Sequence, residues 1–300
     1  HHPAQPVGGM KPMALRSRSS APAASKTARV RRTRGLRIWP YAATGLVVGG
    51  LITLVSQFPA AWAAQWITSG TDGRVKLLDA RGTIWRGSAV LGVGGGAGSR
   101  DARMLPGRLS WNLQTARWPD SYRPALRLAL DHACCLQRPA EVLLSPAWGG
   151  GAFTLKDLDL HVPASVLEGL GTPWNTMALD GALSLTVAQW GGSFSEGRFA
   201  QQGKARLQLT SLTSRVTTVK PVGSYRVTFD AGDGERPGPL RFTLETLQGA
   251  LQLSGQGELA GNGWRFNGEA GTEPRHRAAL ANVLNLIGTR NGPIIFRIRP

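Results

Sequence analysis

Residues 38–57 have the sequence IWPYAATGLVVGGLITLVSQ, and this uncharged stretch decides how the rest of the chain is organised. A helix of this length rises about 30 Å, which matches the hydrocarbon thickness of a bilayer. Aromatic side chains with a polar tip are enriched where a helix enters and leaves the lipid. Trp39 and Tyr41 stand at one end of the stretch, and Trp62 and Trp66 follow its other end. We therefore expect a membrane anchor whose interface residues are these four aromatics.

The segment before the anchor is strongly basic. It contains nine Lys and Arg residues and no acidic residue. Positive charge is retained on the cytoplasmic side of a membrane, so the N-terminus is predicted to be cytoplasmic and the body to lie outside the cytoplasm. Because residues 1–37 are rich in Pro, Ala, Ser and Arg, we expect a disordered cytoplasmic arm. Within it, residues 1–9 are expected to be a cloning remnant or the product of a start site placed too far upstream.

A cleaved secretory signal is the alternative to an anchor. The sequence Ala61-Trp62-Ala63 fits the small-x-small pattern of a cleavage site. The apolar stretch is longer than the core of a usual signal, however, and residues 58–72 also fit an interfacial linker that leads out of the membrane. An uncleaved anchor is the preferred interpretation, and both alternatives place the body outside the cytoplasm.

The charge of the chain is concentrated at its beginning. The formal net charge is +17, of which the first 37 residues hold +9, and the remaining 26 basic and 18 acidic residues leave +8 for the rest. A basic protein of this kind could bind nucleic acid. The densest basic cluster adjoins the membrane stretch, however, where anionic lipid accounts for it better. Nucleic-acid binding is therefore not expected.

The remainder, residues 73–300, has the pattern of a mainly β periplasmic domain built on an antiparallel sheet. Apolar and polar residues alternate, which is typical of strands with one packed and one solvated face. Glycine-rich connections are expected at 92–98, 149–151, 191–192, 230–239 and 261–263. The predicted strands are 109–113, 126–130, 153–155, 158–162, 183–187, 205–209, 225–229, 240–244, 247–253, 264–266 and 294–298.

Two short helices are predicted within the β pattern. The first covers 163–170 and ends at Gly171. The second covers 274–287, with Thr272 as its N-cap, Pro274 in its first turn and Gly288 at its end. Its apolar residues share one helical face that we expect to pack on the sheet. They are Leu280, Val283, Leu284 and Ile287.

The residues that could carry chemistry are few. Cys134 and Cys135 are adjacent and are interpreted as two thiols, one facing in and one out, with a vicinal disulfide as the open alternative. Asp157 and Asp159 are expected to mark a solvated strand face. No metal, cofactor or catalytic site is predicted, because the histidines are isolated and the sequence lacks the strong enzyme motifs.

One stretch occurs twice. LDGALSL at 179–185 is similar to LQGALQL at 247–253, which suggests a repeated hairpin unit or a chance similarity.

Several short motifs in the body occur in the order found in one known family. The segment 81–89, RGTIWRGSA, contains Gly82, Trp85 and Gly87 and follows the N-terminal anchor. Further landmarks are LSWNL at 109–113 with Trp111, VPA at 162–164 with Pro163, LQGALQLSGQG at 247–257 with Gly249 and Gly255, and WRFNGEA at 264–270 with Trp264 and Gly268. From about residue 38 to 300, the chain resembles type II secretion system protein N (general secretion pathway protein N, GspN). The basic arm and the Cys134-Cys135 pair depart from that pattern.

The resemblance implies an accessory, non-enzymatic subunit in the inner membrane of Gram-negative bacteria. Its machine exports folded proteins from the periplasm across the outer membrane. The implied partners are the assembly-platform proteins M, L and C, and by extension the secretin D, with no cofactor and no small-molecule substrate. Edge strands of the sheet could bind a partner by strand addition. Trp85, Trp111 and Trp264 are interpreted as packing residues rather than interface anchors.

Two other functions are kept open. A lipid-handling protein of the AsmA/TamB type would also have an N-terminal anchor and a β-rich periplasmic body, and an apolar, unfilled concave face of the sheet would favour it. A periplasmic enzyme would need a cluster of carboxylates or histidines, which the sequence does not supply.

Overall fold

The computed structural model describes residues 39–96, 98–99, 102–119, 121–171, 174–233, 239–260, 263–287 and 294–298. The predicted cytoplasmic arm, residues 1–37, and the predicted helix end at Gly288 lie outside these ranges. The chain forms two compact units, 1–49 and 50–300. The sheet belongs to the second unit.

The predicted anchor is helical. Helix α1 (Trp39–Ser56) has no buried residue, and among the described residues it is the helix long and apolar enough to cross a membrane. Its 18 residues rise about 27 Å. Trp39 and Tyr41, which were predicted to mark one membrane interface, lie in its first turn and are 81% and 78% exposed.

A second helix occupies the segment predicted as an interfacial linker. Helix α2 (Ala60–Gly70) buries Ala60 and Ala64, one turn apart, and packs mainly on the first strand. Small side chains at this spacing let a helix approach a sheet closely. The bulky residues of α2, Trp62 and Trp66, are 55% and 63% exposed. The helix was missed in the sequence because its buried stripe consists of alanines rather than large apolar residues.

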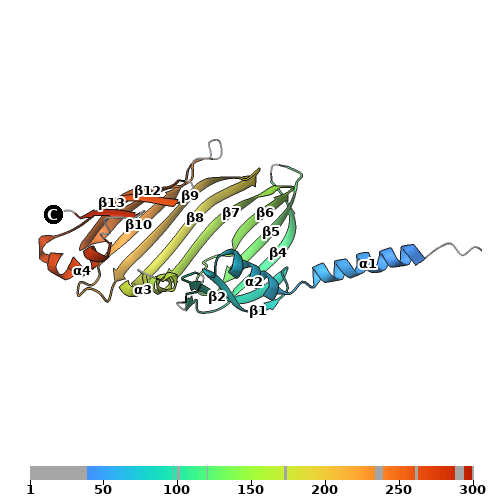
Figure 1. The fold of residues 1–300 in the computed structure, drawn as a ribbon, viewed down its shortest axis with the longest axis horizontal. Helices are drawn as coiled ribbons and strands as arrows, with labels where there is room; N and C mark the ends of the chain where they lie inside the picture. The colour runs from blue at the N-terminus through green and yellow to red at the C-terminus, as the bar shows by residue number, and fades with distance from the viewer. Residues whose placement is uncertain are drawn as a thin grey trace, which may run out of the picture. The chain divides into compact units, whose positions relative to one another are not determined.

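Within the described residues, unit 50–300 is built on one 14-stranded sheet, so the prediction of a mainly β antiparallel fold is confirmed. Strands follow one another in chain order across the sheet, with β3 paired to β2 off the main path (Figure 1). The last pair, β13 and β14, is parallel. The strands are β1 (Val75–Gly82), β2 (Arg86–Gly94), β3 (Ala102–Met104), β4 (Leu109–Arg117), β5 (Pro124–His132), β6 (Ala140–Ala147), β7 (Gly150–Pro163), β8 (Asp180–Ser195), β9 (Arg198–Thr213), β10 (Gly223–Asp230), β11 (Arg241–Gly249), β12 (Leu251–Ala260), β13 (Gly263–Thr272) and β14 (Ile294–Ile298).

Two sequence predictions about the strands were wrong. Residues 247–253 do not form one strand, because the chain turns between β11 and β12 at Gly249, whose φ is 137°. Gly191 and Gly192 do not connect strands but lie inside β8, paired to both β7 and β9. The rings of Phe153 and Phe199 cover Gly192, so glycine provides space there rather than a turn.

The helices connect strands at one end of the sheet. The 3₁₀ helix η1 (Ala164–Leu170) ends at Gly171 as predicted and is followed by α3 (Trp174–Met177). The second predicted helix consists of η2 (Pro274–His276) and α4 (Arg277–Ile287). Its cap was predicted wrongly, because the Thr272 hydroxyl donates to the Ala250 carbonyl instead. Of its predicted apolar face, Leu280, Val283 and Leu284 pack on the sheet, with Leu280 fully buried, and the side chain of Ile287 lies outside what the structure describes.

The sheet has one apolar face and one polar face. Register aligns one row of residues across β7 to β11, namely Leu160, Leu185, Leu207, Val227 and Leu244. The neighbouring row, one residue along, consists of Asp159, Thr186, Arg206, Thr228 and Thr243. Since successive side chains of a strand point to opposite faces, these rows define an apolar face and a polar face of a single-layer sheet.

The sheet curves around its apolar face. Leu91 on β2 and Leu207 on β9 pack into the same cluster, although β4 to β8 lie between these strands in the sheet. In a flat sheet the two strands would be about 29 Å apart. The 3₁₀ helix η1 follows β7 and packs directly against β2. A Cβ at Gly169 of η1 would collide with the Val93 carbonyl oxygen of β2. The apolar face is therefore the concave one.

Phenylalanine rings cover β12 on this face. The rings of Phe242 on β11 and Phe266 on β13 stack with centroids 5.4 Å apart. Gly257 on β12 is the register partner of both, and a side chain there would occupy the space of the Phe242 ring. Gly255 and Gly268 likewise lie beside the Phe266 ring. Glycine in these strands allows the aromatic rings to lie against the backbone.

We predict that Gly257→Val destabilises the sheet. Its methyl groups would displace the Phe242 ring, and overpacking of this kind costs about 1–3 kcal/mol of unfolding free energy. Thermal unfolding of the full chain in detergent, followed by near-ultraviolet circular dichroism, measures the loss. The control is Gln256→Val on the polar face, expected to change stability by less than about 0.5 kcal/mol. Equal melting of the two variants would contradict the prediction.

Candidate functional site

The two ends of the sheet differ in how the apolar face is covered. The helix end carries η1, α3 and α4, and the buried clusters of the described residues lie there. One of them includes Tyr225, whose hydroxyl donates to the Leu251 carbonyl over 3.0 Å. Burial raises the pKa of this phenol above its ordinary value. The opposite end, the tip end, carries the connections β1–β2, β4–β5, β6–β7, β8–β9, β10–β11 and β12–β13.

An apolar groove opens at the tip end of β5 to β9. Its volume is about 620 Å³, and we call it the tip groove. Phe194 and Phe199, partners at the β8–β9 hairpin, are 48% and 59% exposed. The side chains that line it are Leu126, Leu144, Pro146, Phe153, Phe194 and Phe199. The concave face is thus apolar and remains partly accessible at this end.

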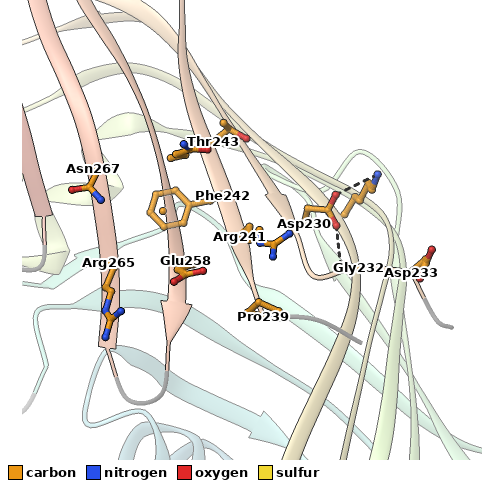
Figure 2. Close-up of a pocket in the computed structure, with 13 residues that line it drawn as sticks. Asp230, Gly232, Asp233, Pro239, Arg241, Phe242, Thr243, Glu258, Arg265 and Asn267 are labelled. Carbon is orange, nitrogen blue, oxygen red and sulfur yellow. Dashed lines mark hydrogen bonds and ion pairs between the residues drawn. The ribbon is translucent and has the colours of Figure 1, made fainter. Parts of the chain in front are cut away.

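A charged cleft of about 890 Å³ lies at the tip end of β9 to β13 (Figure 2). Its charges form a ladder of alternating sign, because each residue is the register partner of the next. The ladder consists of Lys204, Asp230, Arg241, Glu258 and Arg265. Directly opposite residues of unlike charge attract across a sheet. This cleft offers both signs of charge on an exposed surface.

Asp230 is the best-connected member of the ladder. Its carboxylate accepts a hydrogen bond from the Gly232 amide at 2.8 Å and lies 3.4 Å from the Lys204 ammonium. The Gly232 amide, then Lys204 and Arg241, hold the pKa of this carboxyl below its ordinary value. Asp230 therefore remains charged at neutral pH.

The cysteine pair lies beside a buried histidine. Cys134 and Cys135 form a vicinal disulfide, so the interpretation of two thiols was wrong, although Cys134 faces out and Cys135 is buried as expected. His132 is 2% exposed, and its Nδ1 lies 3.2 Å from Cys134 Sγ. Burial lowers the pKa of this imidazole. The donor atoms of the three residues lie within 4.8 Å of one another. That no metal binds here stays a prediction.

The first family motif forms the connection between the anchor and the sheet. The Trp85 indole donates to the Val55 carbonyl over 2.8 Å and lies against Leu51 and Ile52. The Trp111 indole donates to the Thr83 carbonyl, and its ring lies over Gly87, where a Cβ would collide with it. The indoles are thus packed against the chain's own backbone.

Three motif glycines and one proline have local structural roles. Gly82 ends β1 with a φ of 88°. Gly249 and Gly181, at equivalent positions of the two similar stretches, have φ values of 137° and 139°. A left-handed conformation of this kind favours glycine. Pro163 ends β7 and is the N-cap residue of η1. The backbone of Trp264 lies in β13, and its side chain lies outside what the structure describes.

In the described part of the chain, the carboxylates and histidines named in the sequence do not gather in one place. Asp157 lies at an irregular point of β7 with a φ of 52°, while Asp159 lies 3.4 Å from the His161 ring. His132 is in a different cluster, beside the disulfide. An ion pair of Arg103 with the largely buried Glu168 ties β3 to η1. These arrangements fit the stabilisation of a sheet better than acid–base chemistry.

The geometry is that of a single-layer β-sheet protein with an apolar concave face and an exposed charged cleft. Comparison with known protein families identifies the family of the chain. The model of type II secretion system protein N matches residues 73–299. The chain therefore belongs to this family, which is a family of secretion-system components and not of enzymes. No curated protein and no solved structure gives a significant match.

The sequence motifs point to neither the tip groove nor the charged cleft. Both depend on register, which brings together residues far apart in the chain, such as Leu126 and Phe199. A signal for the cleft was present, since each of the strands β9 to β13 carries one of the charged residues of the ladder. It could be used only after strand order and register were known.

We predict that Glu258→Lys destabilises the ladder and that salt reduces the effect. The substitution places a positive charge between Arg241 and Arg265, and two cross-strand repulsions cost about 0.5–2 kcal/mol of unfolding free energy. Glu258→Gln removes the attraction to the two arginines without adding a repulsion, so we expect a smaller loss of unfolding free energy. Thermal unfolding at low and at about 1 M salt separates the two variants. A loss that is equal in both and independent of salt would refute the electrostatic account.

Proposed function

We propose that this protein is an accessory bitopic inner-membrane subunit of the type II secretion machinery. In this proposal residues 1–37 are a cytoplasmic arm, α1 spans the membrane and residues 73–300 form the periplasmic domain. The role is structural, in the export of folded proteins across the outer membrane. The observation that carries it is the family match over residues 73–299. The basic flank of an exposed apolar helix supports the orientation.

The proposed partners are the assembly-platform proteins M, L and C and the secretin D, and the proposed contact surface is the charged cleft. Surfaces with both signs of charge steer association and select partners. The side chains of Lys204 and Asp230 are 73% and 46% exposed, and so they are accessible to another protein. Trp85 and Trp111 are proposed to maintain the fold rather than to contact partners, since both indoles bond to the chain's own backbone.

The orientation predicts the activity of reporter fusions. Alkaline phosphatase, which folds to an active enzyme only outside the cytoplasm, should be inactive after Arg37 and active after Asp72. Replacing Arg29, Arg31, Arg32, Arg34 and Arg37 by Glu should reduce the activity of the second fusion, because the positive flank sets the orientation. An N-terminal epitope tag should remain on the full-length chain. An active fusion at Arg37, or loss of the tag by cleavage near Ala63, would contradict the bitopic topology.

The secretion role predicts specific crosslinks. A photoactivatable residue at Thr243, which lines the charged cleft, should give adducts with M, L, C or D in a cell with a working type II system. The matched control is the same residue at Thr186, on the polar face outside the cleft. Deleting the protein should leave folded cargo in the periplasm. Equal adducts at both positions would remove the cleft from the proposal, and normal secretion without the protein would overturn the function.

A further inference from the structure

The tip groove is an apolar site that the secretion role does not use. It lies on the concave face, where Leu126, Leu144 and Phe153 are only partly buried. Apolar side chains that keep contact with water after folding are unfavourable unless something covers them. A groove of about 620 Å³ is within the usual range for a small-molecule site.

Aromatic residues lie in or beside three successive connections at the tip end, which we call the rim. Tyr122 follows β4 and is 92% exposed, while Trp148, between β6 and β7, is fully exposed. Phe194 and Phe199 complete the rim at the β8–β9 hairpin. Exposed Trp and Tyr side chains at the end of a structure are typical of the interface between lipid headgroups and acyl chains.

The same rim is basic. Arg117 ends β4 and Arg123 precedes β5, so both flank the tip of this hairpin, and both are exposed. The Arg123 guanidinium lies over the Trp118 ring, 5.9 Å from its centroid. Arginine beside aromatic rings complements the phosphate of an anionic lipid and the interface below it.

The groove opens at the end of the sheet where the chain leaves the anchor. Trp85 lies in the β1–β2 connection, and its indole bonds to Val55 in the last turn of α1. The Leu113 amide donates to the Trp85 carbonyl, and β4 continues from there to Arg117 and the rim. The β1–β2 connection, which holds Trp85, and the β4–β5 connection therefore lie at the same end of the sheet.

We propose that the tip groove binds an acyl chain of an anionic glycerophospholipid, with Arg117 and Arg123 at its headgroup. The apolar lining takes the hydrocarbon, the aromatic rim lies at the interface and the two arginines complement the phosphate. The proposal rests on the membrane anchoring proposed above and is independent of the secretion role. A second copy of the chain or a protein segment could also cover an apolar groove, but neither explains a rim that is both basic and aromatic.

The test uses the full chain in nanodiscs that contain phosphatidylglycerol with a photoactivatable acyl chain. Mass spectrometry of the adducts should show labelled peptides from the tip end of β5 to β9, as well as from α1. The double variant Phe194→Asn and Phe199→Asn, at exposed positions, should reduce groove adducts about fivefold, because apolar contact with the chain is lost. The matched control, Thr186→Asn on the polar face, should label like the wild type. Adducts on α1 serve as the internal reference.

The headgroup contribution is measured by competition. Groove labelling in the wild type should be stronger in phosphatidylglycerol than in phosphatidylcholine, and Arg117→Gln with Arg123→Gln should abolish this preference. Labelling of α1 without labelling of the groove would overturn the inference, as would groove labelling that Phe194→Asn and Phe199→Asn leave unchanged. Crosslinks between two copies through the groove would assign it to self-association instead. Absence of α1 adducts would refute the anchor on which the inference rests.

Discussion

The structure depends on one constraint: a single sheet layer with one apolar face has no second sheet to cover it. Alternation places Leu160, Leu185 and Leu207 in one row and their polar neighbours on the other face. Curvature brings the rows of distant strands together, and η1 and α4 cover the apolar face at the helix end. Coverage stops before the tip end, which explains why an accessible apolar groove and an exposed aromatic rim occur on the same molecule.

Strand existence was predictable wherever alternation was regular, because the period of the side chains is a local property. The segments 109–113, 126–130 and 205–209 each lie within a strand. Prediction failed where the role of a glycine was assigned wrongly. Gly192 lies inside a strand and makes space for two aromatic rings, whereas Gly249 makes a turn inside what looked like a continuous apolar pattern. A glycine's role is decided by the residue across from it, and a single sequence does not contain that information.

The same limit applied to the candidate sites. The family motifs were visible, and the structure shows what several of them do: Gly87 accommodates Trp111, and Gly255 and Gly268 accommodate Phe266. The charge ladder could not be assembled from the sequence, because its members are spread from Lys204 to Arg265 and meet only through register. The disulfide was left open, since adjacent cysteines bridge only when the turn that holds them permits it. Features made by residues close together in the sequence were thus easier to predict than surfaces assembled from many strands.

The order of strands has a consequence for how the protein is made. Almost every strand pairs with its neighbours in the chain, so the sheet needs few contacts between distant parts of the sequence. The entropy lost in closing each loop is then small, and each new hairpin can pair with the strand formed before it. A body that emerges from a translocation pore in chain order, after the anchor, would present β1, β2 and β4 before the later strands. Growth of the sheet could therefore keep pace with export, and at each moment only the newest strand would expose an unpaired edge to the aggregation that edges invite.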